Sequence, residues 1–98
     1  MRYYSPDVKQ RVKLRPRTLG RRLAMAAVKK EVSVLQLAYL LGASRGTIYN
    51  WYAGKDVTNA YKSRVSSLIN ILTAAPTPEA AWSQACLHFT LPTSPPAN

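Results

Sequence analysis

The side chains best suited to specific recognition lie in one short stretch, residues 44–55. Arg45 and Asn50 each present two hydrogen-bonding groups in one plane, an arrangement that matches the edge of a nucleic-acid base. Arginine matches the O6 and N7 acceptors of guanine, and asparagine matches the N6 donor and N7 acceptor of adenine. Tyr49 can contact a thymine methyl group or a phosphate. If one surface carries these three side chains, the chemistry that they support is the recognition of base edges.

Groups suited to catalysis or metal binding are sparse. His88 is the only histidine and Cys86 the only cysteine, and residues two apart on a helix do not share a face. No Cys/His cluster has zinc-site spacing, and no glycine-rich loop is suited to a nucleotide. We therefore expect no enzymatic activity, no metal, no cofactor and no small-molecule ligand. The four acids occur singly and predict no pair of carboxylates: Asp7, Glu31, Asp56 and Glu79.

Residues 44–52 are expected to form a short helix with one buried and one exposed side. Ser44 is suited to cap its start, and Gly54 is suited to a left-handed position just past its end. At 3.6 residues per turn, Ile48 and Trp51 lie together and face the core. The residues on the opposite side are Arg45, Gly46, Tyr49, Asn50 and Ala53.

A second short helix is predicted immediately before it. Ser33 and Gln36 have the spacing of a capping box at its start. Gly42 ends this helix after two turns, because glycine adopts a positive φ that turns the chain sharply. Ala43 is small enough to lie beneath the crossing of the two helices. The residues expected on the buried face are Val34, Leu37, Ala38 and Leu41.

Three further helices are expected around these two. One extends from a cap at Thr18 to Lys30, and another runs from the end of a loop at 53–58 to about Thr73. The last begins at Thr77-Pro78-Glu79, and the chain beyond it, residues 91–98, is expected to be disordered. The core-facing residues are expected to be Leu19, Leu23 and Ala26; Tyr61, Val65, Leu68 and Leu72; and Trp82, Cys86 and Phe89.

The charge of the chain predicts an anionic partner. Fourteen Lys and Arg residues accompany four Asp and Glu residues, which gives a formal net charge of +10 and an isoelectric point near 10.3. Ten of the fourteen lie in residues 1–30, where Asp7 is the only acid. This density favours nucleic acid or an anionic membrane. Seven basic residues occur within fourteen positions with no acid among them: Lys9, Arg11, Lys13, Arg15, Arg17, Arg21 and Arg22.

A membrane is the less favoured of these two partners. No apolar run approaches the ~20 residues of a spanning helix. The N-terminus lacks the basic-then-apolar order of a signal peptide, and no lipidation motif is present. A single cysteine forms no intramolecular disulfide, which fits a reducing cytoplasm. We therefore expect nucleic acid as the partner, no membrane, and a cytoplasmic location.

Residues 1–17 form a basic arm before the first expected core helix. Ser5-Pro6-Asp7 can cap a short helix that carries Val8 and Val12. Alternatively, Val12 and Leu14 alternate with basic residues, as in a short strand or an extended arm. The sequence leaves both conformations open. In either, the charge density favours contact with the DNA backbone or the minor groove.

The segment from Leu37 to Lys55 (LAYLLGASRGTIYNWYAGK) resembles the phage-repressor and Cro-type (XRE-like) helix-turn-helix family. Residues 19–23 (LGRRL) resemble the family's first helix, so the likeness covers 19–72, a little over half of the chain. It implies five short α-helices as in the lambda repressor, major-groove binding, and homodimers on two-fold symmetric operators. It also implies base contacts at Arg45, Tyr49 and Asn50, and phosphate contacts at Ser44 and Lys55.

Three residues depart from the family pattern. Val34 stands where a glutamine that binds phosphate is common, and Tyr52 stands where an acid is usual. Gly46 replaces a residue that often reads bases. It shortens the reading surface but allows very close approach.

We therefore predict an all-α protein of four or five helices, with one compact lambda-repressor-like domain. Residues 1–17 form the basic arm, 18–75 the helix-turn-helix domain, and 76–98 a short C-terminal helix and flexible tail. The predicted function is sequence-specific binding of double-stranded DNA, as a homodimeric phage or mobile-element repressor in a bacterial host cytoplasm or nucleoid. Base contacts are expected from Arg45, Gly46, Tyr49 and Asn50. Backbone contacts are expected from Lys9, Arg11, Lys13, Arg15, Arg17, Arg21, Ser33, Ser44, Thr47, Lys55 and Lys62.

The sequence is also compatible with two other functions. An architectural, packaging or recombination accessory protein would use the same charge without base readout. A protein-binding module would use the apolar residues Leu35, Tyr39, Tyr49 and Tyr52 instead. Arg64, like Lys62, either reaches a phosphate or only solvates its helix.

Overall fold

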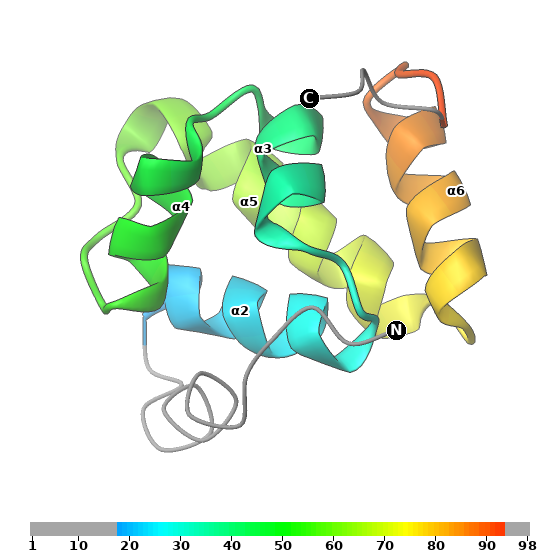
Figure 1. The fold of residues 1–98 in the computed structure, drawn as a ribbon, viewed down its shortest axis with the longest axis horizontal. Helices are drawn as coiled ribbons and strands as arrows, with labels where there is room; N and C mark the ends of the chain where they lie inside the picture. The colour runs from blue at the N-terminus through cyan, green and yellow to red at the C-terminus, as the bar shows by residue number, and fades with distance from the viewer. Residues whose placement is uncertain (1–17, 94–98) are drawn as a thin grey trace.

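The computed structural model describes residues 18–93, and over this range the chain is all-helical (Figure 1). The expected all-α fold of four or five helices is confirmed for these residues. The basic arm, with Lys9, Arg11, Lys13, Arg15 and Arg17, and the end of the tail lie outside the described residues. The helices are α2 (Leu19–Lys29), α3 (Val34–Leu41), α4 (Arg45–Tyr52), α5 (Asn59–Ala74) and α6 (Pro78–His88).

Side-chain caps define where four of these helices begin. Each cap is a hydroxyl oxygen that accepts a hydrogen bond from the backbone N–H three residues later. At the start of α3 the cap is reciprocal: Ser33 Oγ accepts from Gln36 N–H at 3.1 Å, and Gln36 Oε1 accepts from Ser33 N–H at 2.9 Å. The predicted capping box is therefore confirmed. The four capping residues are Thr18, Ser33, Ser44 and Thr77.

All of the helices α2 to α6 contribute buried side chains to one core, with α5 near the middle of the arrangement and α6 along one side of it (Figure 1). α2 contacts both α4 and α5, and α5 also contacts α6. The two shortest helices, α3 and α4, pack against each other, and α2 and α5 hold them in place: α4 packs on α2 and α3 packs on α5. The largest fully buried side chains are Leu23, Leu37, Leu41, Ile48, Leu68, Leu72, Val32, Val65 and Cys86.

Periodicity placed five residues in the core that are only partly buried and pack against it: Leu19, Ala38, Tyr61, Trp82 and Phe89. On α3, Leu40 is buried and Ala38 only half-buried, because nearly every residue of this helix is apolar and the sequence offers more than one apolar face. On α5, Tyr61 is half-buried rather than in the core. Its ring lies edge-on to Trp51 with centroids 5.4 Å apart, while its hydroxyl donates to the Gly42 carbonyl at 3.5 Å.

Residues 91–98 were expected to be disordered, but the first three of them, 91–93, are ordered. Leu91 packs against the core, and its N–H donates to the Cys86 carbonyl at 2.8 Å. The Tyr39 hydroxyl donates to the Pro92 carbonyl, and Trp82 Nε1–H donates to the Thr93 carbonyl, both at 2.8 Å. Because the polar ends of these two aromatic rings find acceptors here, residues 91–93 lie along α3 and α6.

Candidate nucleic-acid interface

The two sides of α4 differ in burial as its periodicity predicts. Ile48 is 0% and Trp51 2% exposed, so one side of the helix belongs to the core. On the opposite side Tyr49 is 58% exposed and stands edge-on to Tyr52, with ring centroids 6.5 Å apart. The structure thus places the predicted base contacts together on one exposed stripe, with Ala53 at its end: Arg45, Gly46, Tyr49 and Asn50.

The C-terminal end of α4 is held by an arginine of α2. Arg21 Nη2–H donates to the Ala53 carbonyl at 2.7 Å, and the guanidinium lies beside Gly54, which has a φ of 108°. Carbonyl groups at the end of a helix lack intrahelical donors and carry partial negative charge, so a guanidinium is a suitable cap. Arg21 was predicted to contact phosphate. The structure gives it a positioning contact, which leaves other guanidinium donors free.

The C-terminal end of α3 is held in the same way from α5. Arg64 Nη1–H donates to the Leu41 carbonyl at 3.1 Å, and the Tyr61 hydroxyl reaches the next carbonyl, that of Gly42. Gly42 has a φ of 67°, as expected for the turn. Arg64 therefore supports the turn between α3 and α4. Sequence reasoning missed this role because no local pattern relates residues 23 positions apart.

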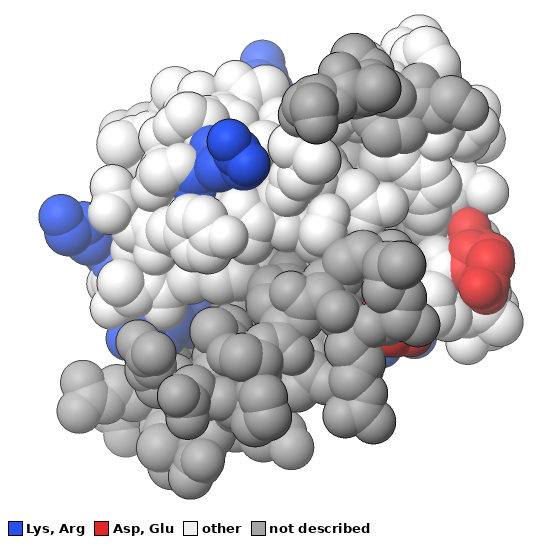
Figure 2. Space-filling view, viewed as in Figure 1, with Lys and Arg blue, Asp and Glu red and all other residues white. Residues whose placement is uncertain are grey.

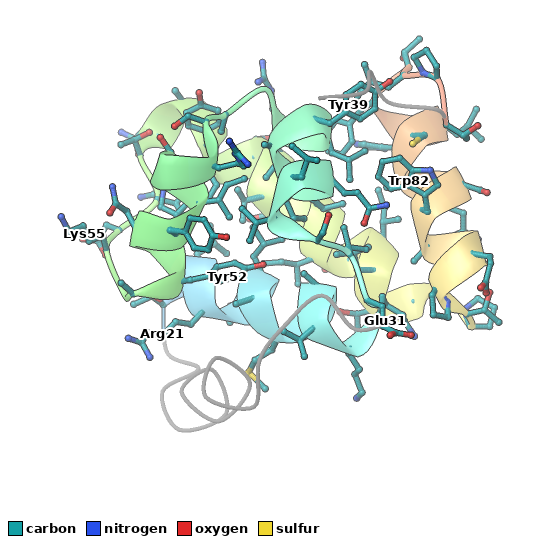
Figure 3. The ribbon with its side chains drawn as sticks, viewed as in Figure 1. Arg21, Glu31, Tyr39, Tyr52, Lys55 and Trp82 are labelled. Atoms are coloured by element: carbon teal, nitrogen blue, oxygen red, sulfur yellow. The ribbon has the colours of Figure 1, made fainter. Side chains whose placement is uncertain are left out.

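The predicted backbone contacts within the described residues come from several elements. Ser44 and Thr47 lie at the start of α4, where their hydroxyl oxygens are 2.9 Å apart. Ser33 caps α3, and a serine hydroxyl that accepts a capping bond still has a hydrogen to donate. Lys55 is exposed directly after α4, on the same side of the molecule as Arg21 (Figure 3). Lys62 is exposed on α5.

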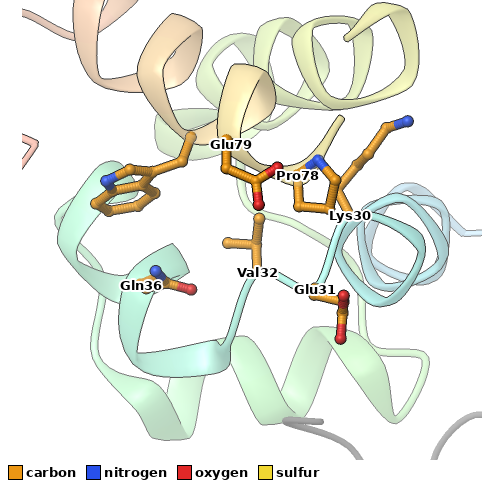
Figure 4. A pocket seen from close by; sticks show the side chains of 7 residues that line it. Lys30, Glu31, Val32, Gln36, Pro78 and Glu79 are labelled. Carbon is orange, nitrogen blue, oxygen red and sulfur yellow. The ribbon is translucent and has the colours of Figure 1, made fainter. Parts of the chain in front are cut away.

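Two of the three acidic residues in the range 18–93, Glu31 and Glu79, lie away from this stripe, whereas Asp56 is exposed in the loop after α4, next to Lys55. In Figure 2 the visible Lys and Arg side chains lie towards α4, whereas the large acidic patch lies over α6. A hollow of about 310 Å³ opens between α3 and the start of α6 (Figure 4). Because two of its lining side chains are carboxylates, which repel phosphate, this hollow is poorly suited to binding a nucleic-acid backbone. Its lining residues are Lys30, Glu31, Val32, Gln36, Pro78, Glu79 and Trp82.

Chemically reactive groups are not assembled within residues 18–93. No group of three or more His, Cys, Asp and Glu in this range is placed to hold a metal ion. Cys86 is buried, and desolvation raises the pKa of its thiol. His88 stands edge-on to Phe89, with ring centroids 4.9 Å apart. None of the helices described has both the length and the apolarity needed to span a membrane.

Comparisons with protein-family models, with curated proteins and with solved structures found no match to this chain.

Proposed function

We propose that this protein binds double-stranded DNA in a sequence-specific way and that α3, the turn at 42–44 and α4 act as a helix-turn-helix. One observation carries the proposal: α4 buries Ile48 and Trp51 while it exposes Arg45 and Asn50 on the other side. These two side chains have the donor and acceptor groups that distinguish guanine and adenine in the major groove.

The dimensions of α4 suit this role. With its side chains an α-helix is about 10–12 Å in diameter, so it fits the major groove, which is about 12 Å wide, and the eight residues of α4 make it about 12 Å long. Arg21 and Lys55 lie at the C-terminal end of α4, where phosphates would flank the groove. Ser44 and Thr47 offer hydroxyl groups at its other end. Base contacts along the middle and phosphate contacts at both ends would orient the helix.

The biological role that we infer is that of a small phage or mobile-element repressor. The likeness of residues 19–72 to the phage-repressor and Cro-type family supports it, as does the basic composition. In this role the protein acts as a homodimer in the cytoplasm of a bacterial host. Each subunit places one α4 in one half-site, and half-sites lie one helical turn (~34 Å) apart.

A selection of binding sites from random duplex DNA tests the proposal. The affinity for the selected and scrambled duplexes is then measured at several salt concentrations. We expect a shared motif, in the form of an inverted repeat, and a preference of about 10³ or more over scrambled duplex. Tight binding without a motif would contradict sequence-specific regulation.

The second candidate function is architectural, and the net charge of +10 favours it. A protein that packages DNA or assists recombination binds through phosphates, so its affinity falls steeply with salt and varies little with sequence. The same selection separates the two functions. A protein-binding module is supported less, because Tyr39 packs against Trp82, with ring centroids 6.2 Å apart, and donates its hydroxyl to Pro92.

A further inference from the structure

Within residues 18–93, no packing contact or backbone angle requires a glycine at position 46. Gly20 lies against Trp51, and Gly42 and Gly54 have positive φ values. Gly46, by contrast, lies in the first turn of α4, is exposed, and has no positive φ. A Cβ atom at this position would meet only Ser44 Oγ, at 3.9 Å, which is an ordinary van der Waals distance. Alanine would therefore fit at position 46.

Alanine would also stabilise the helix. In the middle of a helix glycine is less favourable than alanine by ~0.5–1 kcal/mol, because it loses more backbone freedom on folding, and in the first turn the effect has the same sign. The exposed stripe thus carries a less stable residue, and no contact among the described residues compensates for it. This suggests that glycine is required at residue 46 by the molecule that the stripe binds.

The neighbours of Gly46 indicate what fits there. Tyr49 and Asn50 follow at three and four residues, so they lie one turn further along the same side. Arg45 directly precedes it. The absence of a side chain at residue 46 leaves room on the stripe for a group about one methyl in size, one turn before Tyr49 and Asn50 and next to Arg45 in the chain. In the major groove, the apolar group of that size is the 5-methyl group of thymine.

We propose that Gly46 is a specificity-determining residue and that its gap receives the 5-methyl group of a thymine in the bound site. The inference rests on the proposed function, since it requires α4 in the major groove. A methyl group at residue 46 would occupy the space that the thymine methyl needs. The bound sequence therefore contains a thymine near the bases that Arg45 and Asn50 contact.

The test combines Gly46→Ala with removal of the thymine methyl. The duplex is the site selected by the wild-type chain, and each thymine is replaced in turn by deoxyuridine. At one position we expect this replacement to weaken wild-type binding about fourfold, the effect of burying roughly one methyl group less. Gly46→Ala is expected to bind the thymine duplex at least about tenfold more weakly than the wild-type protein, and to recover on the deoxyuridine duplex.

Ala60→Gly is the matched control, because Ala60 is the exposed second residue of α5, as Gly46 is of α4. It reports the effect of the reverse exchange on stability without changing the stripe, and it is expected to leave DNA affinity unchanged. Circular dichroism confirms that both variants fold.

The outcomes separate this inference from the proposed function. If the wild-type chain selects no site, the proposed function and the inference both fail. If it selects a site and Gly46→Ala binds that site as tightly as the wild-type protein, only the inference fails. It also fails if Gly46→Ala loses affinity equally on thymine, deoxyuridine and scrambled duplexes, because no thymine methyl is then being read.

Discussion

Gly20 of α2 lies directly against Trp51 of α4. A Cβ atom at residue 20 would be 2.6 Å from Trp51 Cβ and 2.7 Å from the Trp51 carbonyl oxygen, distances at which atoms collide. The spacing of the two helices therefore depends on the absence of a side chain at residue 20. Because Trp51 belongs to the buried side of α4, this contact also sets how far the exposed stripe stands from the core.

Replacing Gly20 should therefore destabilise the protein. We expect Gly20→Ala to lower the free energy of unfolding by about 1–3 kcal/mol, as overpacking in a core does, despite the better helix propensity of alanine. Urea denaturation measures this loss. Met25→Ala, at a 38% exposed position of α2, is the control and should change stability by less than about 0.5 kcal/mol. A Gly20→Ala variant as stable as the wild-type chain would show that α2 and α4 can move apart at no cost.

Arg45→Ala and Asn50→Ala should weaken binding in a sequence-dependent way. Each would lose the bidentate base contact proposed for it, so we expect a loss of about 1–3 kcal/mol in binding free energy, or roughly 5- to 150-fold in affinity, on the selected duplex and much less on a scrambled one. Fluorescence anisotropy with both duplexes measures the difference. Arg22→Ala removes the same charge from an exposed position on α2 and serves as the control. Equal losses on both duplexes would mean that these residues supply charge alone.

Removing the charge of Arg64 should lower stability without changing the salt dependence of DNA binding, and removing that of Lys62 should do the reverse. Arg64→Gln loses the bond to the Leu41 carbonyl, and we expect a loss of about 0.5–1.5 kcal/mol in unfolding free energy with the salt dependence of DNA binding unchanged. Lys62→Gln should leave stability nearly unchanged but reduce the slope of log affinity against log salt by about 1, as expected for one lost phosphate contact. The reverse pattern would exchange the roles of the two residues.

The stability of the protein should fall in alkaline solution partly through Cys86. Burial raises the pKa of this thiol above its ordinary value of 9.0, so the unfolded chain loses the proton first as pH rises. The unfolded state then binds fewer protons than the folded state, and the free energy of unfolding decreases above about pH 9. Unfolding free energies of the wild-type chain and Cys86→Ala between pH 7 and 10 measure this effect. Their difference should stay constant up to about pH 8 and shrink above it; a constant difference up to pH 10 would refute the prediction.

Local signals in the sequence determined where most of the helices begin. Thr18, Ser33, Ser44 and Thr77 each cap through a bond to a residue three positions later, so the signal and its partner lie in one short segment. The division of α4 into a buried and an exposed side is equally local, because the helical period alone separates Ile48 and Trp51 from the stripe. The candidate base contacts could therefore be named from the sequence.

Tertiary structure decided what holds that stripe in place. The bond from Arg21 to the Ala53 carbonyl joins residues 32 positions apart, and the bond from Arg64 to the Leu41 carbonyl joins residues 23 apart. The hydrophobic period and the capping residues of one helix carry no information about these long-range hydrogen bonds. The two partners meet only when α2 packs against the end of α4 and α5 packs against the end of α3. For the same reason the sequence could not reveal that Gly20 is required by the fold and that Gly46 is not, because only the packed helices show what a methyl group would meet at each position.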